Sequence, residues 1–247
     1  MQRYFANYEE NRFFINDDDY HHIVRVMRMV VGDEIYCVNN DQQVARCTIE
    51  NITENQVVAK VLQWIEGEIE LPIHVSIVSG LPKGDKLEWI IQKGTELGAN
   101  KFIPFIAARS VVKWDEKKGD KKLSRWNKIA KEAAEQSHRT MVPDVLSPIR
   151  LKELIEISNR YDIKVIAYEE EAKHGEVANL TAAFKNMQKG QSLLAVFGPE
   201  GGFTEQEVEL LKEHGFVACG LGPRILRTET APLYLLSAVS YHFELME

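Results

Sequence analysis

Hydrophobic and polar positions change their spacing along this chain of 247 residues, and the change falls near residue 70. Between Asp33 and Trp64, apolar and polar residues alternate in short segments separated by Asn, Asp and Glu, which predicts a small antiparallel β module, plausibly a barrel. From residue 71 onward, apolar strand-like runs alternate with amphipathic stretches, a pattern typical of a parallel sheet covered by helices. We therefore expect two domains, residues 1–70 and residues 71–247.

Apolar residues recur at helical spacing in several segments of the second part. Thr204 and Glu207 form a capping box at the start of one of them, and Gly215 is placed to end it. Pro232 falls in the first turn of the last one, where its missing N–H costs little. The expected helices are residues 84–98, 123–139, 204–211 and 230–246.

The net charge of −7 is unevenly distributed, and its distribution bears on nucleic-acid binding. Residues 1–70 hold 6 Lys and Arg against 13 Asp and Glu, whereas residues 71–247 hold 24 of each. Residues 109–150 carry 11 basic and 6 acidic side chains. This basic run is suited to contact phosphates, although a charged run is also typical of a solvated surface.

The remaining composition excludes several classes of protein. Cys37, Cys47 and Cys219 show neither CxxC spacing nor neighbouring histidine pairs, so we expect no zinc site, no other metal and no disulfide framework. The N-terminus carries charges where a signal peptide needs an apolar run, and no apolar stretch has the length of a membrane span. We expect a soluble cytoplasmic protein that does not contact a membrane.

Two glycine-bearing loops follow predicted strands, FGPEGGF at 197–203 and LGPRILRTETA at 221–231. Glycines allow the backbone to approach a ligand closely and to adopt conformations that a Cβ forbids. A loop between a strand and a helix lies at the carboxyl edge of a parallel sheet, where open α/β folds bind ligands. The two loops would together form a cleft, although each could also serve only as a turn.

Charged residues within these loops allow two interpretations. Arg224 and Arg227 could serve RNA phosphate or base, with Glu200 and Glu229 paired to them. Alternatively, the four side chains form a structural network that holds the loops. The chain lacks the GxxxxGK[ST] motif of a P-loop and the GxGxxG motif of a dinucleotide site, which counts against both kinds of nucleotide fold.

Five runs of the chain, in the same order, resemble the RsmE family of bacterial 16S ribosomal RNA uridine-N3 methyltransferases. The early segment 21–36 is also similar to that family's N-terminal PUA-like module. The five runs are KGDKLEWIIQKGTELGA (83–99), IPFIAARSVVKW (103–114), RWNKIAKEAAEQSHR (125–139), FGPEGGFTEQEVE (197–209) and LGPRILRTETA (221–231).

The resemblance implies an RNA-binding PUA-like β-barrel at residues 1–70 and, at residues 71–247, an α/β SPOUT domain with a mainly parallel sheet and a C-terminal trefoil knot. It also implies that S-adenosyl-L-methionine binds between the two glycine-bearing loops, with a third wall at the end of a strand. The residues implied to bind the cofactor are Ala167, Tyr168, Phe197, Gly198, Pro199, Glu200, Gly201, Gly202, Leu221, Gly222, Arg224, Ile225, Leu226 and Arg227.

The implied reaction needs a protein that aligns an activated methyl donor with uracil N3 and excludes water. The N3 proton must leave, and Glu200, Glu229 or solvent could take it. Arg227 could instead stabilise the uracil oxygens or the negative charge that deprotonation develops. The sequence does not choose among these roles.

RNA-binding residues are expected around the cleft and in the first module, because the target base must leave its stack or lie in a single-stranded region. His21, His22, Arg25 and Arg28 recur at a spacing that could place several of them on one helical face, beside an apolar stripe of Ile23, Val26 and Met27. Trp114 and His138, which lie within the matching runs, could also contact RNA, although a lone histidine at a helix end is more often a surface or capping residue. The expected RNA-binding residues are Arg25, Arg28, Arg109, Lys113, Arg125 and Arg139.

Three functions are compatible with these features. The first is methylation of uridine N3 in 16S ribosomal RNA of the small ribosomal subunit. The second is a non-catalytic RNA-binding protein of ribosome assembly, and the third is a methyltransferase acting on another RNA such as tRNA. The resemblance further implies a homodimer, to which the final helix could contribute, although its apolar spacing also fits an intramolecular core. The residues concerned are Leu233, Leu236, Val239, Tyr241 and Phe243.

Overall fold

The computed structural model describes residues 1–112, 114–115, 117, 119–168 and 178–246, which form two compact units. The first unit contains Met1–Glu70 together with Ala134–Met141, and the second contains Leu71–Ala133 and Val142–Glu247. The division after Glu70 lies where the hydrophobic pattern changes. Ala134–Met141 joins the first unit through contacts that are distant in sequence, which no local pattern indicates.

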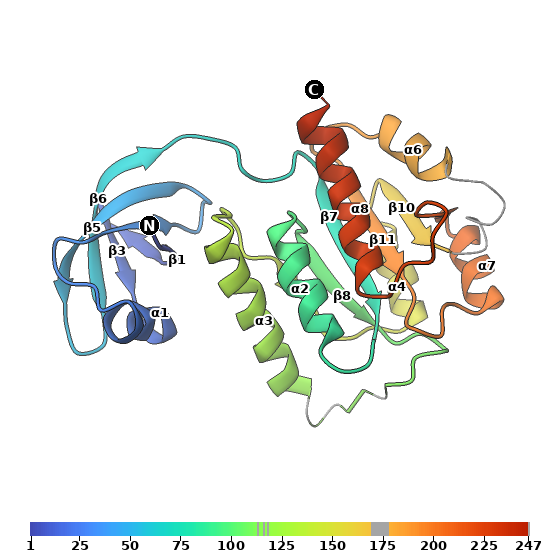
Figure 1. The fold of residues 1–247 in the computed structure, drawn as a ribbon, viewed down its shortest axis with the longest axis horizontal. Helices are drawn as coiled ribbons and strands as arrows, with labels where there is room; N and C mark the ends of the chain where they lie inside the picture. The colour runs from blue at the N-terminus through green and yellow to red at the C-terminus, as the bar shows by residue number, and fades with distance from the viewer. Residues whose placement is uncertain (113, 116, 118, 169–177, 247) are drawn as a thin grey trace. The chain divides into compact units, whose positions relative to one another are not determined.

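A six-stranded sheet that curls around an apolar core forms most of the first unit (Figure 1). Its strand order is β1-β4-β5-β6-β3-β2, so β1 and β2 lie at its two edges and the strands form a curled sheet rather than a closed barrel. The β1–β4 pair is parallel and the other pairs are antiparallel. The antiparallel pairing predicted between Asp33 and Trp64 is confirmed by the β4–β5 and β5–β6 pairs. The strands are β1 Arg3–Phe5, β2 Asn7–Glu9, β3 Arg12–Ile15, β4 Glu34–Val38, β5 Val44–Ile52 and β6 Val57–Ile65.

Alternation of side chains explains the core of this sheet. Ile35, Cys37, Cys47, Ile49 and Val57 are all buried and point to one face, as expected for a strand period of two residues. Short helical turns, α1 Asp17–His21 and the π-helical turn His22–Val26, cover part of this core. The first unit is therefore built around a single apolar face.

The second unit contains a six-stranded parallel sheet in the order β12-β10-β11-β7-β8-β9. Such a sheet has both faces buried, and consecutive residues of β11 enter two different apolar clusters, Leu193 and Ala195 on one face and Leu194 and Val196 on the other. The strands are β7 His74–Gly80, β8 Lys101–Phe105, β9 Asp144–Val145, β10 Ile163–Ala167, β11 Ser192–Phe197 and β12 Val217–Cys219.

Helices cover both faces of this sheet (Figure 1). Side chains of α2, α3, α6 and α8 belong to one apolar cluster, whereas those of α4 and α7 belong to the cluster on the opposite face. The architecture is an α/β layer structure, as the alternation of runs predicted. The helices are α2 Lys86–Glu96, α3 Gly119–Gln136, α4 Leu151–Ser158, α6 Ala178–Lys185, α7 Glu205–Glu213 and α8 Thr230–Ser240, followed by a π-helical turn at Tyr241–Leu245.

Helix boundaries agree with the sequence where capping residues mark them. The hydroxyl of Thr204 accepts from the Glu207 backbone N–H, and the Glu207 side chain accepts from Thr204, so the capping box is confirmed. Helix α3 starts four residues before the expected 123 and ends at Gln136. Its end precedes His138, whose φ of +60° lies outside the right-handed helical region.

The last helix contributes mainly to the core. Leu236 and Val239 are fully buried and Phe243 is nearly so, whereas Tyr241 is exposed. Leu233 is half-buried. The apolar spacing of this helix therefore reflects intramolecular packing at three of the five positions named from the sequence.

The parallel arrangement brings the carboxyl ends of several strands to one edge of the sheet. Gly80 at the end of β7 pairs with Phe105 of β8, and Ala167 at the end of β10 pairs with both Phe197 of β11 and Cys219 of β12. Loops that follow these residues must therefore meet at this edge. Among the described helices, none combines the length and the apolar character needed to cross a membrane.

Candidate functional site

A cavity of about 510 Å³ lies at the carboxyl edge of the parallel sheet. Its volume is within the range of about 300–1,000 Å³ that is usual for small-molecule sites. Both polar and apolar groups line it, and they come from five separate segments of the second unit. These residues are Lys86, Arg109, Ala167, Tyr168, Phe197–Phe203, Ile225–Thr228 and Ala231.

The structure brings together most of the residues expected at the cofactor site. Eleven of the fourteen line this cavity, from the end of β10, the loop after β11 and the turn before α8. The other three, Leu221, Gly222 and Arg224, are not part of the lining. Leu221 packs against the core, Gly222 is buried with a φ of +85°, and Arg224 is exposed.

Close backbone packing fixes the path of the first glycine loop. A Cβ on Gly80 would lie 2.4 Å from the Pro199 nitrogen, and a Cβ on Gly201 would lie 3.0 Å from the Arg109 carbonyl oxygen. At Gly202, with a φ of +66°, a Cβ would meet nothing within 4 Å. The loop is thus packed tightly against its neighbours at Gly80 and Arg109, while its Gly202 side faces open space.

The acidic residues of the two loops bind a lysine instead of the arginines proposed from the sequence. Lys86 Nζ lies 2.9 Å from Glu200 Oε1 and 3.5 Å from Glu229 Oε2. The backbone N–H of Lys83 also donates to Glu200 Oε1, at 3.1 Å. Pairing of Glu200 and Glu229 with Arg224 and Arg227 is therefore wrong for this structure, because Lys86 at the start of α2 reaches both carboxylates.

This contact changes the acid–base properties of the pair. Burial raises the pKa of Glu200, but hydrogen bonds from Lys86 and from backbone N–H groups outweigh it, so the net pKa lies below its usual value. The hydrogen bond to Glu200 raises the pKa of Lys86. Both groups are consequently charged at neutral pH.

Arg227 and Arg109 both bring positive charge to the cavity lining. Arg227 precedes α8 and is exposed, and Arg109 follows β8 and donates from Nη1 to the Gly201 carbonyl oxygen at 3.3 Å. Buried Glu207 anchors the Arg109 loop, since its Oε1 accepts from the Ala108 N–H at 2.8 Å. The capping box of α7 thus also positions a pocket residue.

Other residues expected to bind RNA differ in their surroundings. Arg25 and Arg28 are exposed, and exposed Val26 and Met27 lie between them in the chain. His22 is half-buried, and its Nδ1 lies 3.0 Å from the Tyr4 hydroxyl. Exposure makes Arg25 and Arg28, but not His22, available to a phosphate.

The basic run after β8 is only partly accessible. Arg125 pairs with Glu88 at 2.7 Å while remaining mostly exposed. Trp114 stacks on Trp126 with ring centroids 5.6 Å apart, so at least one of its faces is covered. Lys113 lies outside the described residues.

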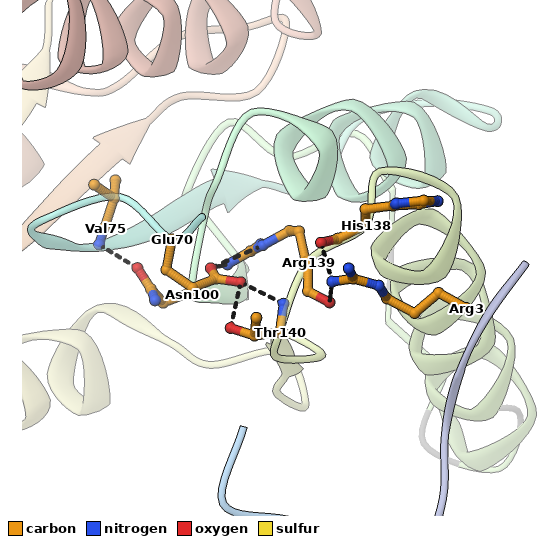
Figure 2. A network of polar contacts seen from close by, with 7 residues as sticks. All are labelled: Arg3, Glu70, Val75, Asn100, His138, Arg139 and Thr140. Atoms are coloured by element: carbon orange, nitrogen blue, oxygen red, sulfur yellow. Dashed lines mark hydrogen bonds and ion pairs between the residues drawn. The ribbon is translucent and has the colours of Figure 1, made fainter. Parts of the chain in front are cut away.

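Arg139 is a correction to the expected RNA-binding set, because only 3% of it is exposed. Figure 2 shows its side chain directed at Glu70. Its guanidinium forms an ion pair with Glu70, which also accepts from the N–H and hydroxyl of Thr140 at 2.8 and 3.2 Å. Arg3 donates to the carbonyl oxygens of His138 and Arg139. Arg139 therefore holds the 138–140 turn inside the first unit and does not present its charge to a ligand.

Lys86 is the pocket residue that the sequence interpretation missed. Its position in the sequence could have indicated this role. The segment KGDK at 83–86 follows a predicted strand and is therefore expected at the same sheet edge as the two glycine-bearing loops. Within the described part of the chain, no group of three His, Cys, Asp or Glu side chains is arranged to hold a metal ion.

Comparison with known proteins gives matches over the whole chain. A family model described as "RNA methyltransferase domain" matches residues 69–240, and one described as "RNA methyltransferase PUA domain" matches residues 15–62. Ribosomal RNA small subunit methyltransferase E of Bacillus subtilis is 55% identical over 252 residues, covering 100% of this chain and 98% of that protein.

Two solved structures of similar proteins contain S-adenosylmethionine. Ribosomal RNA small subunit methyltransferase E of Neisseria gonorrhoeae is 27% identical, with a TM-score of 0.82 and coverage of 97% of each chain. A methyltransferase of Legionella pneumophila is 28% identical, with a TM-score of 0.81 and coverage of 96% of each chain.

Proposed function

The chain belongs to the RsmE family of ribosomal RNA small subunit methyltransferases, and from this premise we propose that it methylates N3 of a uridine in 16S ribosomal RNA, with S-adenosyl-L-methionine as the methyl donor. The observation that carries the proposal is the cavity at the sheet edge, which is lined by both glycine-bearing loops. The proposal thus rests on the family to which the chain belongs and on a cavity whose lining suits this cofactor.

The cavity fits this cofactor in size and in the nature of its walls. The loop 198–202 offers mainly backbone groups, and open space at Gly202 leaves room for a ligand. Ala167, Ile225 and Leu226 supply apolar surface, and Arg109, Arg227 and Glu200 supply charge. When bound, the cofactor supplies an activated methyl group, and the residues of the chain hold it and exclude water.

We propose that Arg227 stabilises negative charge on the uracil. Its side chain is exposed at the cavity, and a guanidinium favours an oxygen on which charge develops when N3 loses its proton. Glu200 is a weak candidate for the general base, because its lowered pKa and its ion pair with Lys86 reduce its tendency to take a proton. Glu229 is not part of the cavity lining, so we assign the N3 proton to solvent.

We propose that the first unit binds RNA near the target nucleotide. Residues 1–70 form the PUA-like domain, and residues 71–247 form the methyltransferase domain. The match of residues 15–62 to a PUA domain of RNA methyltransferases supports this division. Exposed Arg25 and Arg28 are the phosphate contacts we propose there, and Arg109 and Arg125 those in the second unit.

Three further properties complete the proposal. The loops after β11 and β12 form the trefoil knot that the family resemblance implies, and the position of β10 between β11 and β12 is compatible with such a crossing. The protein works as a homodimer on 16S ribosomal RNA in the small ribosomal subunit. A cytoplasmic location follows from this substrate.

Mass spectrometry of ribosomal RNA tests the main proposal. Purified protein is incubated with S-adenosylmethionine and either 16S ribosomal RNA or small subunits from cells that lack the gene, and the methylated nucleoside is then mapped. We expect N3-methyluridine at one position. Methylation of tRNA alone, or S-adenosylmethionine binding without transfer to any RNA, would replace this proposal with one of the two alternatives.

A further inference from the structure

Lys86 occupies a position between the two glycine-bearing loops. Its Nζ lies 2.9 Å from Oε1 of Glu200 in the first loop and 3.5 Å from Oε2 of Glu229, the residue of the second loop directly before α8. Lys86 is also part of the cavity lining. One ammonium group from a third element, α2, thus joins the two walls of the cavity.

The three charged groups of this contact are partly buried. Side-chain exposure is 35% for Lys86, 28% for Glu200 and 25% for Glu229, so all three groups have lost much of their solvation. Without Lys86, two carboxylates that lie within 3.5 Å of one point would repel each other across the cavity wall. The lysine therefore supplies the positive charge that holds the two carboxylates together.

A second lysine of the same helix provides a comparison. Lys93 is exposed to a similar extent and pairs with Glu96 at 2.7 Å, but both residues belong to α2. That pair joins consecutive turns of one helix, an arrangement that stabilises a helix only slightly. Lys86 differs because its partners are distant in sequence and come from separate loops.

We propose that Lys86 is a positioning residue of the cofactor site: its ion pairs with Glu200 and Glu229 hold the loop after β11 and the turn before α8 in the conformation that binds S-adenosylmethionine. This inference rests on the proposed function. It assigns Lys86 no contact with the reacting atoms. Its consequence is that loss of the lysine weakens cofactor binding while the methyl transfer step continues once the cofactor is bound.

Calorimetric titration with S-adenosylmethionine tests the proposal in the full-length protein. We expect Lys86→Gln to weaken binding by about fivefold or more, the size expected from losing partly exposed ion pairs. Lys86→Arg, which keeps the charge, should bind within about twofold of wild type. Lys93→Gln is the matched control and should bind as wild type does.

A mutant cycle separates positioning from direct contact with the cofactor. If Lys86 acts through the two carboxylates, Lys86→Gln should cause no further loss in a Glu200→Gln/Glu229→Gln background. An undiminished loss in that background would overturn the proposal, as would wild-type affinity of Lys86→Gln itself. Thermal unfolding of each variant without cofactor verifies that the fold persists, and Lys86→Arg provides the measurement if Lys86→Gln does not fold.

Kinetics with RNA add a readout that a purely structural role would not give. We expect Lys86→Gln to raise KM for S-adenosylmethionine and to leave kcat within about threefold of wild type. An equal fall of kcat and kcat/KM would contradict the positioning role. Failure of the wild-type protein to bind the cofactor or to methylate uridine N3 would instead count against the proposed function, so the two failures can be told apart.

Discussion

Single charged residues in this protein have roles that depend on their neighbours more than on their type. Arg139 and Arg109 both belong to the basic run that suggests RNA binding, yet Arg139 is buried against Glu70 and Arg109 is exposed beside the cavity. Glu200 likewise carries a lysine partner that lowers its pKa. The residues that surround a charged side chain therefore determine whether it stabilises the fold or remains available to bind a ligand.

The Arg139–Glu70 pair should stabilise the first unit. We expect Glu70→Ala to lower the free energy of unfolding by about 3 kcal/mol, because it leaves a buried guanidinium without its carboxylate. The change should also raise hydrogen exchange in residues 134–141. Urea unfolding followed by hydrogen exchange measures both effects.

Glu68→Ala, at an exposed acidic position two residues away, is the control and should leave stability unchanged. Arg139→Ala should weaken RNA binding no more than Glu70→Ala does. A larger loss of RNA affinity in Arg139→Ala, at equal stability, would restore Arg139 as an RNA contact.

Glu200 should not act as the general base. We expect Glu200→Gln to keep kcat within about tenfold of wild type and to raise KM for S-adenosylmethionine, whereas loss of a general base typically costs about 10²- to 10⁴-fold in rate. Since its pKa is lowered, Glu200 stays ionised from about pH 6 to 9, and the pH profiles of kcat should be parallel in both proteins over that range. A hundredfold loss of kcat with unchanged KM would reverse this assignment.

At the scale of elements, strand ends determine the shape of the cavity. The loop after β11 packs on the end of β7 at Gly80, and the loop after β8 packs on it at Gly201. Glu207 connects α7 to the loop after β8. The site is thus assembled from loops that pack against one another. A substitution at the end of one strand should therefore displace the neighbouring loop.

Gly80→Ala should displace the first glycine loop. The added Cβ would lie 2.4 Å from the Pro199 nitrogen, a backbone atom that cannot rotate away. We expect a loss of stability of about 1–3 kcal/mol from overpacking, and S-adenosylmethionine affinity reduced by about tenfold or more. Urea unfolding and calorimetry measure the two effects. Ser79→Ala, which removes an atom at the neighbouring position, should retain cofactor affinity, and normal affinity of Gly80→Ala would show that the loop tolerates the displacement.

At the scale of the whole molecule, apolar surface remains at the C-terminal end of the chain. Tyr234, Tyr241 and Leu245 are exposed by 40%, 59% and 71%, although their neighbours Leu236 and Val239 lie in the core. Residues 234, 241 and 245 recur at helical spacing, and exposed apolar groups in such an arrangement are typical of an interaction surface. They are the residues of this helix that remain available for the homodimer we propose.

Tyr241→Glu should therefore dissociate the homodimer. A carboxylate placed in an apolar interface loses its hydration without gaining a partner, which opposes association. Light scattering coupled to size exclusion should give a dimeric mass for the wild type and a lower average mass for Tyr241→Glu. Val30→Glu changes an equally exposed valine of the first unit and should remain dimeric. A monomeric wild type would exclude the homodimer.

The α/β class, the capping box at Thr204 and the two glycine-bearing loops could be predicted from the sequence. Local patterns carry this information, because side-chain periodicity and backbone conformational freedom act over a few residues. The order of the strands along the chain also implied a common edge at which the loops meet. Eleven residues expected at the cofactor site do line one cavity there.

The pairing of charged groups depends on the fold and could not be predicted from the sequence. Lys86 joins Glu200 and Glu229 across more than a hundred residues of sequence, and Glu70 reaches Arg139 across 69. Charge and spacing cannot choose between such partners, since a lysine or arginine suits any nearby carboxylate and only the folded chain determines which one is near. The apolar spacing of the final helix likewise fitted either an interface or an intramolecular core, and the folded chain places Leu236 and Val239 in the core.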